Sequence, residues 1–177
     1  EMARAEEQRA LRKRPADLDA WDMSHRALWH VYRYTKEDNE KAHELLERAA
    51  ALDPNWALPH SWMAFRHLTD ALLGFGADPA QSLKLCGEAA ERAVRLDGQD
   101  PLARGTLSIA NIWLDRRRAI SEGEKAIALN PSLFYGYIGL GASLGFLGRW
   151  EECLAHSQTA SKLSPRDPLL TFVLTIE

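Results

Sequence analysis

The sequence predicts an all-α fold, a right-handed superhelical solenoid of antiparallel helix pairs, and two observations carry this prediction. First, a small residue, an alanine seven positions later and a helix stop five positions after that recur four times. Second, the leucines two positions before each stop (Leu52, Leu96, Leu129 and Leu163) are 44, 33 and 34 residues apart, a spacing typical of stacked helical repeats. The four copies are Ala42, Ala49 and Pro54; Cys86, Ala93 and Gly98; Ala119, Ala126 and Pro131; and Cys153, Ala160 and Pro165.

Helix breakers divide the chain into pairs of helices. Residues that favour strands are sparse and never alternate at period two, so no strand is expected. Asp-Pro, Asp-Gly, Asn-Pro and Ser-Pro steps at 53, 97, 130 and 164 each end one helix. A longer link within the second pair, residues 74–79, ends in Asp78 and Pro79, a good N-cap and first helical residue. The predicted helices cover 16–35 and 38–52, 55–73 and 79–96, 100–114 and 116–129, and 132–147 and 150–163.

The two ends of the chain have different characters. Residues 1–14 are dense in Glu, Arg, Lys and Ala and stop at Pro15, which predicts a charged helical linker from an upstream domain. The repeat domain then covers 15–177, with pairs at about 16–52, 55–96, 100–129 and 132–163. The apolar stretch at 167–177 predicts the start of a fifth unit, either a cut through a longer array or a surface that pairs with another chain.

The composition excludes several classes of protein. The 177 residues are 46% hydrophobic and 27% charged, as in an ordinary globular domain. The formal net charge of −3 gives no general attraction to nucleic acid, and no apolar run approaches the ~20 residues of a membrane span. We therefore expect a protein or peptide partner, with no nucleic acid and no membrane span.

Both cysteines, Cys86 and Cys153, occupy the slot that Ala42 and Ala119 fill in the other copies. We predict that they are small packing residues between helices. A disulfide is not expected, because equivalent slots two repeats apart lie beyond the ~7 Å Cα separation that a disulfide bridges. Reduced cysteines suit the cytoplasm, which is the expected location.

No motif in the sequence predicts a catalytic, cofactor or metal site. His60 and His67 are seven residues apart on one helix, but a metal site needs further ligands beside them. Gly139, Gly141 and Gly145 predict close helix packing rather than a phosphate-binding loop. The basic run at 116–118 fits either a solvated helix start or a contact for an acidic partner or phosphate. We expect no catalytic residue, no cofactor and no metal.

The repeat unit resembles the tetratricopeptide repeat, a helix–turn–helix of 34 residues. The fourth pair matches it best: Tyr137, Leu140, Gly141 and Leu144 follow the first-helix pattern, and Gly148 turns the chain. The match covers about residues 16–177, with Gly98 where proline is usual. Small residues at the matched positions let helices approach closely. The repeat-packing residues are Ala42, Ala49, Pro54, Cys86, Ala93, Ala119, Ala126, Pro131, Leu140, Gly141, Cys153, Ala160 and Pro165.

A narrower resemblance is to the C-terminal repeat region of bacterial class III adenylate/guanylate cyclase-like proteins. It is carried by residues 14–22 (Arg-Pro-Ala-Asp-Leu-Asp-Ala-Trp-Asp), by residues 29–39 (Trp-His-Val-Tyr-Arg-Tyr-Thr-Lys-Glu-Asp-Asn) and by the insertion at 74–82. The resemblance implies a bacterial signalling protein whose cyclic nucleotide is made by an upstream domain. The metal-binding aspartates of the cyclases belong to that domain and have no counterpart here.

The tetratricopeptide resemblance also implies where a partner binds. First helices of the pairs line a concave face in such arrays, and here that face is apolar and lacks the cations of a carboxylate clamp. We expect a non-catalytic interaction or regulatory module whose groove takes a peptide or an amphipathic helix. The alternatives are that the same stripe is covered core, that it mediates self-association, or that the chain is a segment of a cyclase. The expected groove residues are Trp21, Tyr32, Phe65, Leu68, Ile109, Trp113, Tyr135, Ile138 and Phe146.

Overall fold

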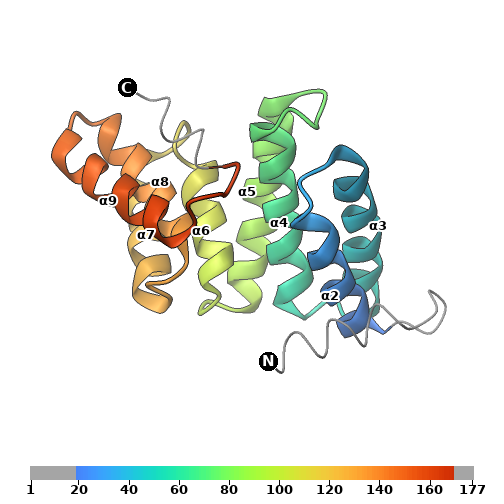
Figure 1. The fold of residues 1–177 in the computed structure, drawn as a ribbon. Coiled ribbons are helices and arrows are strands. Elements are labelled where there is room, and N and C mark those ends of the chain that lie inside the picture. Colours follow the sequence, from blue (N-terminus) through green and yellow to red (C-terminus); the bar gives the residue numbers. More distant parts are fainter. Residues whose placement is uncertain (1–18, 170–177) are drawn as a thin grey trace.

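The computed structural model describes residues 19–169, and all regular structure within that range is helical (Figure 1). The predicted linker at 1–14 and most of the predicted fifth unit at 167–177 lie outside the described residues. No helix of the described range is long and apolar enough to cross a membrane. The helices are α2 (Ala20–Val31), α3 (Lys36–Leu52), α4 (Ala57–Leu72), α5 (Pro79–Leu96), α6 (Pro101–Ala110), α7 (Arg116–Leu129), α8 (Phe134–Gly145) and α9 (Trp150–Leu163).

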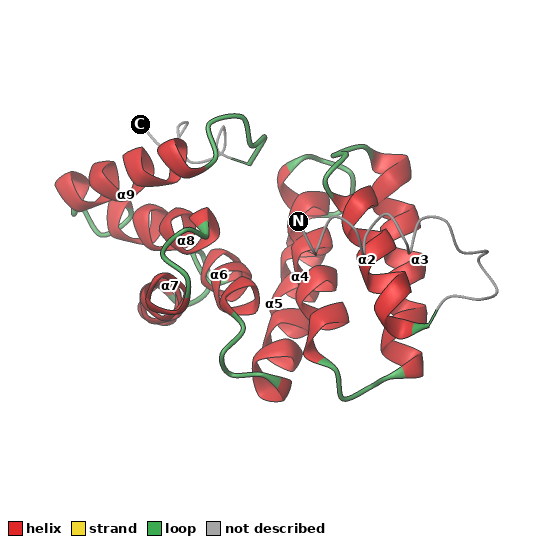
Figure 2. Cartoon of the chain, turned by 60° about the horizontal axis from the view of Figure 1, so that its bottom comes forward, coloured by secondary structure: helices red, strands yellow, loops and turns green. Residues whose placement is uncertain are grey.

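Consecutive helices pack as four pairs, α2 with α3, α4 with α5, α6 with α7, and α8 with α9. The first helices also contact one another, α2 against α4, α4 against α6 and α6 against α8. We call α2, α4, α6 and α8 the first-helix row. Figure 2 shows the four pairs following one another along the molecule, which is the predicted helix-pair solenoid.

Side-chain caps explain where most of the second helices begin. The side chains of Thr35, Asp78 and Asp115 accept hydrogen bonds from backbone amides in the first turns of α3, α5 and α7. Pro79 follows Asp78 as the first residue of α5, where its missing amide hydrogen costs nothing. The helices predicted over 79–96, 116–129 and 150–163 have the same bounds in the structure.

The first helices are shorter than predicted, and α6 shows why. It ends at Ala110 rather than at 114. The side-chain amide of Asn111 donates to the Leu107 carbonyl oxygen at 2.8 Å. The backbone amide of Asn111 is shared between the Leu107 and Ser108 carbonyls, at 3.2 Å each, and this tightens the last turn of the helix.

The predicted packing positions lie at the helix contacts. Small side chains at these positions are fully buried, and Cys153 is half-buried against Gly145. Both cysteines are free thiols. The prolines at 54, 131 and 165 are exposed in the turns that follow each pair. The buried positions are Ala42, Ala49, Cys86, Ala93, Ala119, Ala126, Leu140, Gly141 and Ala160.

Gly139 shows why this packing requires small residues. A Cβ atom at this position would lie 2.7 Å from the Cβ of Ser108 and 3.1 Å from the Ile109 backbone nitrogen. The hydroxyl of Ser108 donates to the Ala119 carbonyl at 2.7 Å, so α6, α7 and α8 meet at this point. The interpretation of this glycine as a close-packing residue therefore agrees with the structure.

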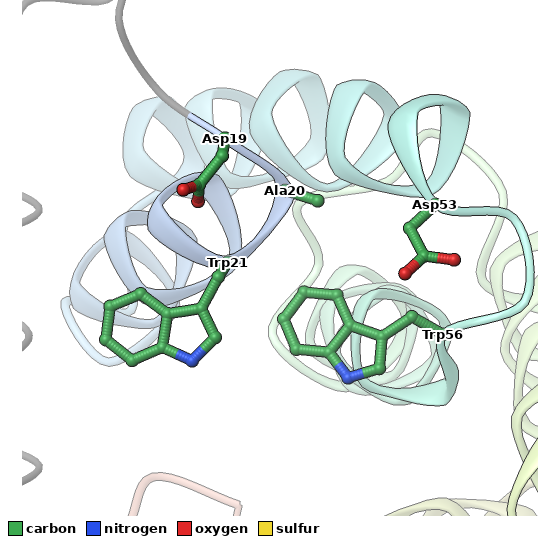
Figure 3. Close-up of a pocket in the computed structure, with 5 residues that line it drawn as sticks. All are labelled: Asp19, Ala20, Trp21, Asp53 and Trp56. Carbon is green, nitrogen blue, oxygen red and sulfur yellow. The ribbon is translucent and has the colours of Figure 1, made fainter.

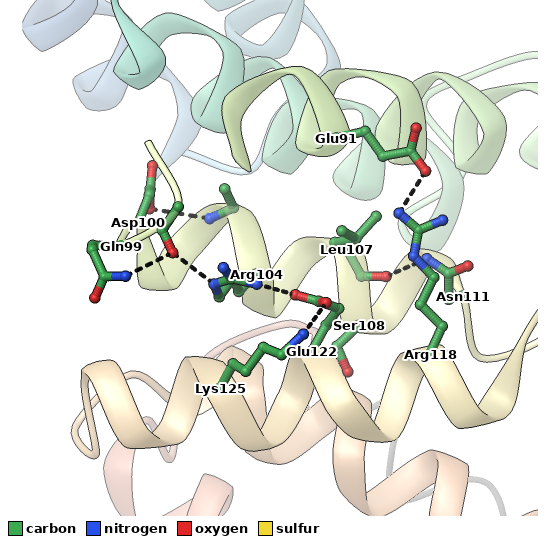
Figure 4. Close-up of polar contacts among 12 residues, drawn as sticks. Glu91, Gln99, Asp100, Arg104, Leu107, Ser108, Asn111, Arg118, Glu122 and Lys125 are labelled. Carbon is green, nitrogen blue, oxygen red and sulfur yellow. Dashed lines mark hydrogen bonds and ion pairs between the residues drawn. The ribbon is translucent and has the colours of Figure 1, made fainter. Parts of the chain in front are cut away.

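Charged side chains tie α5, α6 and α7 together (Figure 4). Arg104 of α6 donates to Glu122 of α7 at 2.5 Å, and Lys125 donates to the same carboxylate at 2.7 Å. Burial alone would raise the pKa of Glu122, but these two donors hold it below its usual value. Arg118 of α7 reaches Glu91 of α5 at 2.8 Å. The Arg104–Glu122 contact joins the two helices of the third pair, and the Arg118–Glu91 contact joins that pair to the second.

Candidate functional site

The structure divides the nine expected groove residues into a buried set and an accessible set. Phe65, Leu68, Ile109, Tyr135 and Ile138 are buried. These five side chains are core residues of the described chain, so the open apolar groove expected along the whole concave face is not what the structure shows. Tyr32, Trp113 and Phe146 are exposed, and Trp21 is half-buried.

A chain of aromatic rings explains the burial of the central part of the first-helix row. Trp62 lies edge-on to Tyr32 and to Phe65, with ring centroids 5.6 and 5.7 Å apart. The ring of Phe65 on α4 then meets that of Tyr135 on α8 at 4.8 Å. Such tilted and edge-on ring pairs fill space well between helices. The Phe65–Tyr135 contact connects α4 to α8, and both rings are buried there.

A hydrogen bond between the first pair and the last turn also closes this region. The hydroxyl of Tyr34, in the turn between α2 and α3, donates to the carboxylate of Asp167 at 2.9 Å. Burial and the charge of Asp167 together raise the pKa of Tyr34, and burial raises the pKa of Asp167. Figure 1 shows residues 164–169 leaving α9 and running toward α4. We call residues 164–169 the closing segment.

Asp38 fixes the turn that carries Tyr34. Its carboxylate accepts hydrogen bonds from the Thr35 hydroxyl at 2.7 Å, from His30 Nδ1 at 2.8 Å and from Arg33 Nε at 2.8 Å. These donors, with Thr35 first, hold the pKa of Asp38 well below its usual value. The backbone of Tyr34 has φ +49°, an uncommon conformation for this residue type that the surrounding contacts maintain.

A second polar cluster joins α3 to α4. The side-chain amide of Asn39 donates to Asp70 at 2.6 Å, and Arg66 pairs with the same carboxylate at 2.5 Å. His67 lies beside this pair, with Nδ1 3.8 Å from Asp70. Within residues 19–169, no three His, Cys, Asp or Glu side chains are grouped so that they can hold a metal. The bond from Asn39 to Asp70 connects the second helix of the first pair to the first helix of the second pair.

A shallow pocket of about 320 Å³ lies at the start of α2 (Figure 3). It is lined by Asp19, Ala20, Trp21, Asp53 and Trp56. The indole of Trp21 stacks on His25 with ring centroids 3.7 Å apart. Two indoles beside two carboxylates favour cations over anions. Of the expected groove residues, Trp21 alone lines this pocket.

Exposed apolar side chains gather at the turns of the third and fourth pairs. Leu114 is 77% exposed and Trp150 is 61% exposed. The two turns are connected, because the guanidinium of Arg116 lies 5.3 Å from the ring of Phe146. Both turns lie at the upper edge of the molecule in Figure 1. We define the turn-edge patch as the exposed side chains Trp113, Leu114, Phe146, Leu147, Trp150 and Leu154.

The basic run beside this patch is only partly engaged within the chain. Arg118 pairs with Glu91, and Arg116 covers Phe146. Arg117 is exposed. Side chains at the first turn of α7 thus place positive charge next to the apolar surface, although cations at a helix start oppose the helix dipole.

Sequence reasoning identified Trp113 and Phe146 but missed other residues of these surfaces. Leu114, Leu147 and Trp150 lie in or beside turns, where apolar residues carry no periodic signal. Tyr34 and Asp167 were missed because their contact joins distant parts of the sequence. One signal for Asp167 was present: Asp-Pro-Leu occurs twice, at 100–102 and at 167–169.

The fold is that of proteins built from tetratricopeptide repeats. A scan against protein-family models finds no match, and neither does a search of curated proteins. Among solved structures, TTC0263, described as a thermophilic tetratricopeptide-repeat protein of Thermus thermophilus, superimposes with a TM-score of 0.69 at 18% identity, covering 96% of this chain and 86% of that one. A structure of MamA gives a TM-score of 0.54 at 21% identity over 73% of this chain and 71% of that one. Another structure, of MamA AMB-1, gives a TM-score of 0.53 at 20% identity over 98% of this chain and 86% of that one. At these identities the likeness establishes the fold, which is a helix-pair solenoid of the tetratricopeptide-repeat type.

Proposed function

We propose that this chain is a non-catalytic protein-interaction module and that its turn-edge patch is the contact surface. The observation that carries the proposal is that two connected turns expose four large apolar side chains and that the start of α9 exposes two more. Contiguous apolar surface on a folded protein is typical of a site where another protein binds. The fold supports the same conclusion, since stacked helix pairs offer extended surfaces for partners.

The patch favours a partner segment with apolar anchors and flanking acidic residues. Leu114, Leu147 and Trp150 offer flexible and aromatic surfaces that desolvate large side chains well. Arg117 stands beside them and gives the rim a positive charge. An acidic flank on the partner is attracted to that rim, which increases the association rate at low salt.

Site-specific photo-crosslinking tests the proposal. A photoreactive amino acid at Leu114 should crosslink one protein at defined stoichiometry in cells that express the natural protein. The matched control is the same amino acid at Leu52, which is 60% exposed at the end of α3 and outside the patch. Equal crosslinking from the two positions would reject the patch as the contact surface.

Self-association is the second candidate function. Trp150 and Leu154 leave the outer face of α9 apolar and exposed, and a second copy is one way to cover it. Light scattering distinguishes the two functions. If the chain stays monomeric at concentrations far above those at which it binds its partner, self-association is rejected. A dimer that Trp150→Ser converts to a monomer establishes self-association.

The wider setting is proposed from the sequence resemblance. On that basis the chain is the C-terminal part of a bacterial signalling protein, with an adenylate/guanylate cyclase as the specific alternative. A cytoplasmic location is supported by two free thiols. Assays of the intact parent protein for cyclic nucleotide from ATP or GTP test the alternative, and the chain alone should show no turnover.

A further inference from the structure

The closing segment repeats the sequence that begins α6. Asp100, Pro101 and Leu102 start that helix, and residues 167–169 have the same order, Asp-Pro-Leu. Asp100 Oδ1 accepts the backbone amide of Leu102 at 2.8 Å, and Asp167 Oδ1 accepts that of Leu169 at 2.9 Å. Both aspartates therefore accept the backbone amide two positions later, in a helix start at Asp100 and in a turn at Asp167.

The second carboxylate oxygen of the two aspartates is used differently. Oδ2 of Asp100 accepts the hydroxyl of Ser61 on α4, the first helix of the preceding pair. Oδ2 of Asp167 accepts instead the hydroxyl of Tyr34, from the first pair of the array. Asp167 thus reaches the first pair of the array, whereas Asp100 bonds the pair that precedes its own.

Leu169 completes this docking. Its side chain is 1% exposed and belongs to the same buried apolar cluster as Phe65, Tyr135 and Ile138. The charge of Asp167 acts on the hydroxyls of Tyr32, Tyr34 and Tyr135. An acidic group beside tyrosine hydroxyls and a leucine two positions later in an apolar cluster form a two-point contact.

We propose that Tyr34 and the buried apolar cluster beside it form a recognition site for a segment of the sequence Asp-Pro-Leu, and that the chain fills the site with its own residues 167–169. The outside ligand is a protein segment with the same acidic, proline and leucine order. This site is separate from the turn-edge patch and does not depend on the function proposed for that patch.

Competition within the chain sets the affinity for such a segment. A tethered occupant has an effective concentration in the mM range when its linker is short. A free segment must exceed that advantage, so the wild-type chain should bind it weakly. Weakening the chain's own contacts should make the site available without changing the residues that form it.

Fluorescence anisotropy with a labelled peptide of residues 163–172 tests the proposal on the full chain. The variant Asp167→Ala/Leu169→Ala should bind this peptide at least about 10-fold more tightly than the wild type does, which corresponds to about 1.4 kcal/mol. Adding Tyr34→Phe to that variant should weaken binding several-fold. Adding Tyr137→Phe is the matched control, since its hydroxyl bonds the Pro131 carbonyl elsewhere, and should change nothing.

One further variant of the chain and one variant peptide complete the experiment. If the double variant folds poorly, Asp167→Asn alone is the alternative, because it preserves the size of the side chain. This single variant should give an intermediate gain in peptide affinity. A peptide with Asn in place of the aspartate should bind less tightly to the opened chain. Equal peptide affinity of the wild-type and opened chains, or equal effects of Tyr34→Phe and Tyr137→Phe, would overturn the proposal. Trp150→Ser should leave peptide binding unchanged, which separates this site from the turn-edge patch.

Discussion

The Tyr34 hydroxyl donates a 2.9 Å hydrogen bond to the Asp167 carboxylate, which lies 133 positions later in the sequence. The bond connects the turn of the first helix pair to the segment that follows the last described helix. It makes the array a closed unit in this region instead of an open curve. The rings of Trp62, Phe65 and Tyr135 are buried in this region, whereas Trp113, Leu114, Phe146 and Leu147 are exposed in the turns of the third and fourth pairs.

Removing that hydroxyl should destabilise the fold. Tyr34→Phe leaves the partly buried Asp167 carboxylate without its donor, and hydrogen bonds to charged groups contribute about 2 kcal/mol. We expect the free energy of unfolding in urea, followed by circular dichroism, to fall by about 1–2 kcal/mol. Tyr137→Phe, which removes an exposed hydrogen bond, should cost about 0.5 kcal/mol. Equal losses in the free energy of unfolding would show that the hydrogen bond to Asp167 stabilises the fold no more than the exposed bond of Tyr137 does.

Acid should destabilise the protein through Asp38. Its pKa is lowered in the folded state by the hydroxyl of Thr35 and by His30 and Arg33. The stabilisation is therefore complete above the unfolded value of about 3.9 and is lost as the pH falls from there toward the folded pKa. Urea unfolding midpoints measured between neutral pH and strong acid should fall in this range. Asp38→Asn should flatten the decline, and an unchanged decline would assign the acid sensitivity to other groups.

A methyl group at Gly139 should disrupt the contact between α6 and α8. The added Cβ would overlap the side chain of Ser108 and crowd the backbone of Ile109, and overpacking of this kind costs about 2–3 kcal/mol. Gly87→Ala is the matched control on α5, since its Cβ would only touch Ala110 at 3.9 Å. The control should stabilise by about 0.5–1 kcal/mol, because alanine favours the helix. Thermal melts of both variants test the contrast, which equal shifts would contradict.

The two thiols should react at very different rates. Cys86 is fully buried, and burial raises its pKa to about 12, so almost no thiolate is present near neutral pH. Cys153 is half-buried at the edge of α9. In native protein, mass spectrometry after maleimide treatment should find label on Cys153 first and on Cys86 only after unfolding. Early labelling of Cys86 would mean that α5 and α6 separate readily.

The local architecture was largely readable from the sequence. Asp78, Pro79 and Asp115 mark helix starts through short-range hydrogen bonds, and the repeated alanines mark close helix contacts, so both signals are contained in neighbouring residues. The burial of the concave face could not be predicted from neighbouring residues in the same way. Whether Phe65 and Tyr135 are open or covered depends on the curvature of the array and on contacts such as that of Asp167, which no local pattern encodes.

Only two of the six residues of the turn-edge patch were predicted, for a related reason. Trp113 and Phe146 were expected on the concave face because they continue the helical periodicity of α6 and α8. Both helices end before these residues, at 110 and 145, so the side chains belong to turns. Leu114 and Leu147 accompany them there, and their exposure follows from the early helix ends.

The central claim, that the turn-edge patch binds a protein, is tested most directly by titrating the purified protein that crosslinks at Leu114. Calorimetry should give a saturable isotherm with the wild-type chain. Leu147→Ser/Trp150→Ser should weaken the affinity at least about 10-fold, or about 1.4 kcal/mol, while Leu52→Ser leaves it unchanged. Equal affinities for the wild-type chain and both folded variants would contradict the account.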